Sequence, residues 1–129
     1  MFKGMTFLAI AVCLCACDDS KPAPDTEADV LAMWTHAGLA VGDHQPLADH
    51  NLGDADCQRG EISGVETTIC GYESADAAKA AQPAGLSLVG AVTGASLPRG
   101  KVLLVVADRN NRDPSGKTIH AVTKAFLGR

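Results

Sequence analysis

The sequence predicts an α+β domain in which an N-terminal helix is followed by two ββα units. Three features indicate this fold: a hairpin pattern that carries two cysteines, a strongly apolar run at residues 101–107, and helix-start signals at three places. The simplest arrangement of these elements is a four-stranded, mainly antiparallel sheet with the helices on one face. With 129 residues, the chain has room for one domain, which we place at residues 26–129.

Residues 1–16 have the pattern of a signal peptide. Lys3 supplies a positive charge, and an apolar run extends from Met5 to Ala16. This run is shorter than the roughly 20 apolar residues that a transmembrane helix needs. It leads into Leu14-Cys15-Ala16-Cys17, which resembles the lipobox of bacterial lipoproteins. The resemblance implies cleavage before Cys17 and acyl chains on this cysteine; an ordinary secretory signal is the alternative.

An acylated Cys17 implies that the chain is held at a membrane of the cell envelope, inner or outer, with its domain on the periplasmic or extracellular side. Residues 17–25 are then the lipidated cysteine and a polar tether. The eight residues from Asp18 to Asp25 reach at most roughly 26 to 29 Å when fully extended. We therefore expect the domain to stay close to its membrane.

A helix is predicted from Thr26 to about Gly38. Thr26 is a suitable N-cap, and acidic residues occupy the first turn. Val30 and Trp34 lie on the apolar side of this helix. We expect Trp34 to be a core residue; a position at the membrane interface is the alternative.

Cysteine usage predicts a disulfide between Cys57 and Cys70. Of the five cysteines, two leave with the signal peptide and Cys17 carries the lipid, so one pair remains in an oxidising compartment. A hairpin with its turn at Ser63-Gly64 places these two cysteines directly opposite each other. A reactive thiol is the alternative, although the neighbouring side chains are acidic.

The same register creates one conflict. It places Glu61 opposite Glu66, and like charges directly across a ladder are unfavourable. A four-residue loop would keep the register and relax this clash.

The loop at residues 42–56 is rich in side chains of the metal-ligand type. The candidate ligands are His44, Asp49, His50, Asp54 and Asp56. A calcium loop needs glycine at its sixth position and glutamate at its twelfth, where this chain has Asp54 and Gly60. The histidines also lack the spacing that presents a zinc pair from one element. We therefore predict a solvated loop with no metal or other cofactor, and a metal-binding loop is the alternative.

After the hairpin, Ser74 caps a short predicted helix that Pro83 should end. Residues 86–97 predict a glycine-interrupted strand, and a turn at residues 98–100 leads to the apolar strand at residues 101–107. This last strand is apolar on both faces, so we place it in the centre of the sheet.

The last predicted helix has Asp113 as its N-cap and Pro114 at its first position, and it extends to about Leu127. Its buried stripe is Ile119, Val122 and Phe126, and another face carries Lys117, His120 and Lys124. The preceding Ser115-Gly116-Lys117-Thr118 is similar to the end of a phosphate-binding loop. Asn111 stands where such a loop needs glycine, so no nucleotide site is predicted.

Charge is divided unevenly along the chain. Residues 18–76 carry 13 acidic and 2 basic side chains, whereas residues 77–129 carry 2 acidic and 8 basic ones. We expect the two halves to neutralise each other in one fold. Separate patches are the alternative, and a basic patch would suit anionic lipid or an acidic partner.

These features predict a small lipid-anchored binding module rather than an enzyme, because no nucleophile and base stand in a recognisable pattern. The expected partner is the membrane, through the anchor, with an envelope protein as a second candidate. Nucleic acid is not expected, because aromatic residues are too few for a stacking surface. The rivals are a metal-binding protein that uses the loop at residues 42–56 and a small hydrolase. The hydrolase would use an Asp with one of four histidines: His36, His44, His50 or His120.

Overall fold

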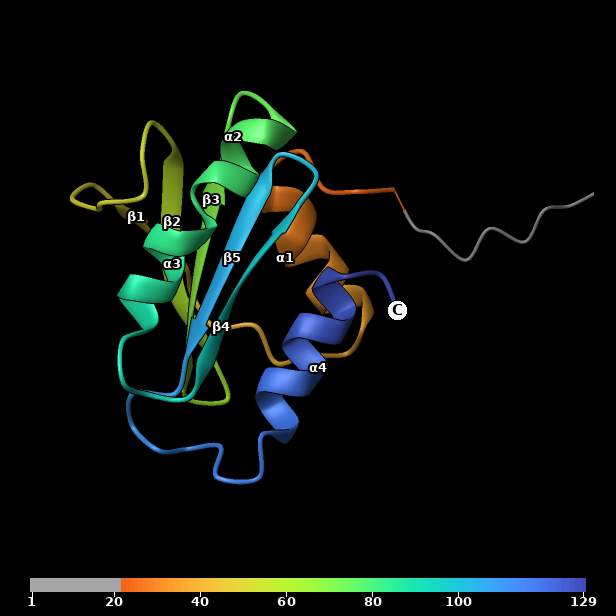
Figure 1. Cartoon of the computed structure of the whole chain (residues 1–129). Helices are drawn as coiled ribbons and strands as arrows, with labels where there is room; N and C mark the ends of the chain where they lie inside the picture. Colours follow the sequence, from red (N-terminus) through yellow and green to blue (C-terminus); the bar gives the residue numbers. More distant parts are fainter. Residues whose placement is uncertain (1–21) are drawn as a thin grey trace, which may run out of the picture.

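The computed structural model describes residues 22–129 and has an α+β fold (Figure 1). Five strands form one antiparallel sheet in the order β1-β2-β3-β5-β4. The elements are α1 (Glu27–His36), β1 (Gln45–Leu47), β2 (Asp56–Ile62), β3 (Val65–Gly71), α2 (Ala75–Ala80), α3 (Gln82–Val89), β4 (Gly94–Arg99), β5 (Val102–Ala107) and α4 (Lys117–Phe126). The predicted signal peptide and the lipidation site Cys17 lie outside the described residues. No helix between residues 22 and 129 is long and apolar enough to cross a membrane.

Helices cover both faces of the sheet, so the prediction that they lie on one face was wrong. Figure 1 shows α1 and α4 on one side of the strands and α2 and α3 on the other. The cause is β5, in which all six residues are buried. Successive side chains of a strand point to opposite faces, so a strand that is apolar throughout needs cover on both.

Each face has its own hydrophobic core. The first joins the helices α1 and α4 to the sheet through Val30, Trp34, Ile62, Val65, Ile69, Val102, Leu104, Val106, Val122 and Phe126. The second joins α2, α3 and the loop before β2 to the sheet through Leu52, Cys57, Cys70, Tyr72, Ala78, Val89, Leu103 and Val105. The expected position of Trp34 in the core is confirmed, because its side chain is 0% exposed.

The β2–β3 hairpin has the predicted register. Cys57 faces Cys70 in the ladder, and a disulfide joins them with a Cα–Cα distance of 4.1 Å. Ser63 and Gly64 form the turn with positive φ angles of 50° and 83°. A two-residue turn of type I′ requires such angles at both positions, and its twist matches that of the strands.

The expected conflict between Glu61 and Glu66 is present in this register. Two arginines relieve it. The Glu66 carboxylate lies 3.1 Å from Arg109 Nε and 3.6 Å from Arg59 Nε. A longer hairpin loop is therefore not needed to hold the two carboxylates opposite each other.

Residues 86–97 do not form one strand, and this error changes the order of the elements. Pro83 stands in the first turn of α3, where a proline removes no helical hydrogen bond, so it begins a second helix. Gly85 faces the sheet, and a Cβ there would collide with Ser96 Oγ. Gln82 and Ser96 tie α3 to β4: the Gln82 Nε2 group donates to the Ser96 carbonyl (3.0 Å), and the Ser96 hydroxyl donates to the Gln82 carbonyl (2.9 Å).

The fifth strand, β1, was also not predicted. It has three residues at the edge of the sheet and lies inside the polar loop, where no alternating apolar pattern marks it. The helix α1 agrees with its prediction, since Thr26 is the N-cap and forms a capping box with Asp29.

The helix α4 begins at Lys117, later than predicted, after a left-handed Gly116 with a φ of 75°. Asp113 nevertheless caps it from a distance. Its Oδ1 accepts from the Thr118 N–H (3.0 Å) and its Oδ2 from the Ile119 N–H (2.9 Å). These hydrogen bonds, above all the one from the Ile119 N–H, stabilise the ionised carboxylate and hold the pKa of Asp113 below its ordinary value.

Candidate functional site

A groove runs between the exposed sides of α1 and α4. Its volume is about 600 Å³, and small-ligand sites commonly have about 300–1,000 Å³. The floor consists of alanines from both helices with Met33 and Leu39, and the rim carries His36, Lys124 and Arg129. The groove therefore combines an apolar floor with two cationic side chains, Lys124 and Arg129, at its edges.

The groove exists because short side chains stand above a firm contact. The Trp34 indole N–H donates to the Val122 carbonyl (3.1 Å) and holds α1 against α4 beneath the groove. Ala121 and Ala125 are four residues apart, so they share one face of α4, and Ala32 of α1 lines the same groove. Longer side chains at these positions would fill the hollow.

The charged side chains that line the groove are the bases Lys124 and Arg129. His36, Lys124 and Arg129 are exposed, and no Asp or Glu of the described chain lines the groove. Residues 114–129 contain three Lys or Arg and no acidic residue. His120 and Lys124 also line an adjoining recess, so the positive surface continues along α4.

The acidic side chains gather elsewhere. Glu27, Asp54, Asp56 and Glu73 line a separate recess of about 240 Å³. Between described residues, one ion pair joins a base of the C-terminal half to an acid of the N-terminal half, that of Arg109 with Glu66. This pair joins the two halves, as expected from the sequence, while the linings of the groove and of the recess differ in charge.

His44, a candidate metal ligand, has both ring nitrogens in hydrogen bonds within the fold. Its Nδ1 lies 2.9 Å from the Gly42 carbonyl, and its Nε2 lies 2.7 Å from the Thr67 hydroxyl. A ring nitrogen against a carbonyl must donate, so Nδ1 carries the proton and Nε2 accepts from Thr67. The ring also packs near Trp34, with ring centroids 6.0 Å apart.

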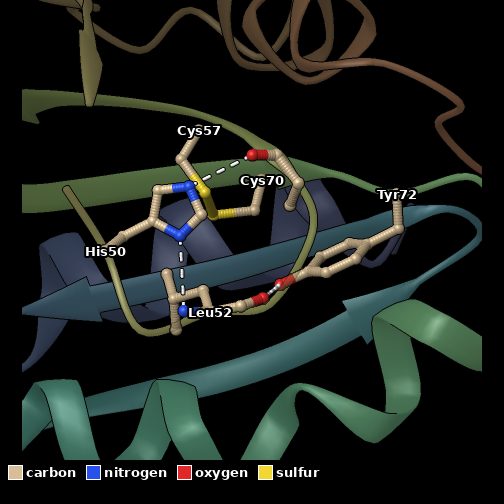
Figure 2. The surroundings of a disulfide bond; sticks show 6 residues. His50, Leu52, Cys57, Cys70 and Tyr72 are labelled. Atoms are coloured by element: carbon tan, nitrogen blue, oxygen red, sulfur yellow. Dashed lines mark hydrogen bonds between the residues drawn. A yellow bond between two sulfur atoms is a disulfide. The ribbon is translucent and has the colours of Figure 1, made fainter. Parts of the chain in front are cut away.

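His50, a second candidate, organises the loop next to the disulfide (Figure 2). Its Nε2 donates to the Ala55 carbonyl (3.1 Å), and its Nδ1 accepts from the Leu52 N–H (3.3 Å). The Tyr72 hydroxyl donates to the Leu52 carbonyl (2.5 Å), and burial raises the pKa of this phenol, which favours the neutral donor. This loop therefore covers the disulfide and closes the second core.

The remaining candidate ligands, Asp49, Asp54 and Asp56, are exposed. Within residues 22–129, no three His, Cys, Asp or Glu side chains are placed to hold a metal ion. The histidines are scattered as well: His36 lies in the groove and His50 beside the disulfide. Neither the metal nor the hydrolase alternative gains support from this geometry.

Sequence reasoning singled out Lys124 and His120 as one face of the last helix but missed the groove. A signal was present, since alanines recur four residues apart in a helix that carries only basic charges. That signal becomes a site only when α1 packs beside α4, which local sequence does not reveal.

Comparisons with models of protein families, with curated proteins and with solved structures give no match for this chain.

Proposed function

We propose that this protein is a lipid-anchored lipoprotein of the cell envelope whose domain binds anionic, partly apolar ligands in the α1–α4 groove. One observation carries the binding role: the groove has an apolar floor and a rim of Lys124, Arg129 and His36, with no acidic side chain of the described residues among its lining. The anchor rests on the lipobox-like Leu14-Cys15-Ala16-Cys17 and on the polar tether that follows.

The groove suits such a ligand for two reasons. Its alanines, Met33 and Leu39 remove the apolar part of a ligand from water, which contributes about 25 cal/mol for each Å² buried. The basic rim meets a carboxylate, sulfonate or phosphate group, and this contact sets orientation more than affinity.

The anchor is tested by fractionation of cells with detergent phase separation. Cys17→Ser is expected to abolish membrane partition and to leave the domain folded, since residues 22–129 form two hydrophobic cores among themselves. Cys13→Ser is the matched control and should partition as the parent does. A Cys17→Ser variant that still partitions would place the anchor elsewhere.

The groove is tested with anilinonaphthalene sulfonate, an anionic aromatic probe, on the processed chain from residue 17 with Cys17→Ser. Ala32→Phe should fill the groove and weaken the fluorescence gain, whereas Ala80→Phe, on the exposed side of α2, should not. Lys124→Glu should weaken binding and Lys79→Glu should leave it unchanged. Equal loss from both members of either pair would refute the assignment of the site.

A further inference from the structure

The first described residues fix one side of the domain to the incoming chain. Pro24 is buried, and its carbonyl accepts from the Lys101 N–H (3.3 Å) in the turn between β4 and β5. Gly100 makes this approach feasible, because a Cβ there would collide with the Pro24 carbonyl oxygen. The domain is therefore held at Pro24 and not at the start of α1.

The distance from the acylated residue to this point is short. Cys17 and Pro24 are seven residues apart in the sequence, so the chain between them spans at most about 25 Å. A domain of this size has a diameter of roughly 34 Å, from the usual scaling of its radius of gyration. The side of the domain opposite Pro24 therefore cannot reach the bilayer surface.

The groove lies on the side that can reach it. Figure 1 shows the first described residues, α1, α4 and the C-terminus on the same side of the sheet. The Arg99 guanidinium donates to the Phe126 carbonyl (2.8 Å), so the end of α4 lies beside the end of β4 and its turn to β5. Lys101, Lys124 and Arg129 are all exposed in this region.

We infer that the ligand of the groove is anionic phospholipid of the anchoring bilayer, and that Lys124 and Arg129 contact its head groups while Met33 and Leu39 face its apolar part. This inference rests on the lipid anchor proposed above. Charge complementarity supports it, since residues 114–129 carry no acidic side chain. At physiological salt, only charges within about 8 Å of the bilayer surface interact with it without strong screening. The acidic recess lies at the end of α1 opposite His36, since Glu27 of the first turn lines it. The proposed contact therefore requires a tilt that keeps this end off the anionic surface.

Two acidic residues set the tilt of the domain. Asp25, just before the N-cap Thr26, and Asp29, in the first turn of α1, are exposed at the opposite end of that helix from His36. An anionic surface repels them, so the domain should lean on the α4 side of the groove rather than on the start of α1.

The test uses the lipidated mature protein in vesicles of phosphatidylcholine alone or of phosphatidylcholine with phosphatidylglycerol. A water-soluble amine reagent labels exposed lysines, and mass spectrometry gives the labelling of Lys124 relative to Lys79, an exposed lysine on α2. This ratio should fall severalfold in the anionic vesicles and recover in high salt. Arg129→Glu should largely restore it, because each basic residue changes the docked population by roughly fivefold, whereas Lys79→Glu, followed through Lys124 labelling, should have no effect.

The same spectra separate the two proposals. If Cys17 carries no acyl mass, the anchor fails and this inference falls with it. If Cys17 is acylated but the labelling ratio is equal in both vesicles, or both lysines are protected equally, the membrane contact alone is refuted.

Discussion

The disulfide provides the most direct test of how the two cores are related. Replacing both cysteines, Cys57→Ala with Cys70→Ala, removes a cross-link between residues 13 apart in sequence. Both residues belong to the second core and neither belongs to the first. We therefore expect lower stability with the fold retained.

The magnitude has two parts. The chain-entropy model gives about 3 kcal/mol for a loop of this length. The cysteines are 5% and 0% exposed, so each substitution also removes one buried heavy atom, at roughly 0.5–1.5 kcal/mol each if Ile→Val is the guide. The expected loss is about 4–6 kcal/mol, against total stabilities of about 5–15 kcal/mol for domains of this kind.

Urea unfolding followed by circular dichroism measures this loss on the processed chain with Cys17→Ser. Reduction of the parent separates the two parts, because it breaks the cross-link but keeps both sulfur atoms; it should cost about 3 kcal/mol, less than the double variant. Two reactive thiols in the unfolded, unreduced parent would refute the disulfide. Loss of all secondary structure in the double variant without urea would refute the independence of the first core.

Three smaller changes test other contacts. Tyr72→Phe leaves the buried Leu52 carbonyl without its donor, so unfolding by urea should show a loss of about 1–3 kcal/mol; an unchanged midpoint would mean that water replaces the hydroxyl. Asp113→Asn should lower Tm at neutral pH. The pKa of Asp113 is below the ordinary 3.8 in the folded state, so its contribution is present above that value and is lost as pH falls through the folded pKa; a Tm difference that persists at lower pH would contradict this cause. Glu61→Gln removes the like charge opposite Glu66 and should stabilise by at most about 0.2–1 kcal/mol, because Arg59 and Arg109 relieve only part of the repulsion; an unchanged midpoint would show that the two arginines already cancel it.

The hairpin could be predicted in full because its information is local. The positions of two cysteines, a Ser-Gly turn and a period of two leave one register that places Cys57 opposite Cys70. The N-caps Thr26 and Ser74 could be predicted for the same reason, since a cap accepts from an N–H group only three residues away. Such features need no knowledge of the rest of the fold.

The prediction for the segment after Pro83 was wrong because the deciding information is not local. Its apolar residues and glycines match a strand as well as a short helix, and periodicity alone does not separate the two. The deciding feature is Gly85, which lets α3 approach Ser96 and the sheet closely. That contact joins elements that the sequence alone does not pair.

The sequence does contain the information that both faces of the sheet are covered. The run Val102–Ala107 predicts a strand buried on both sides, and this requirement conflicts with helices on one face only. The structure resolves the conflict with the second core around Leu103 and Val105. The groove, by contrast, depends on how α1 packs beside α4, and no local pattern specifies that packing.

The two faces of the sheet are closed in different ways. Beside α2 and α3, the His50 loop and the disulfide cover the sheet with local hydrogen bonds. On the other side, two long-range bonds fix α4: Trp34 holds its middle, and Arg99 holds its end through the Phe126 carbonyl. These bonds hold α4 against α1 and β4 and so fix the walls of the groove. The ligand that we propose for the groove would therefore meet a preformed site, which loses less of its contact energy to ordering than a mobile one.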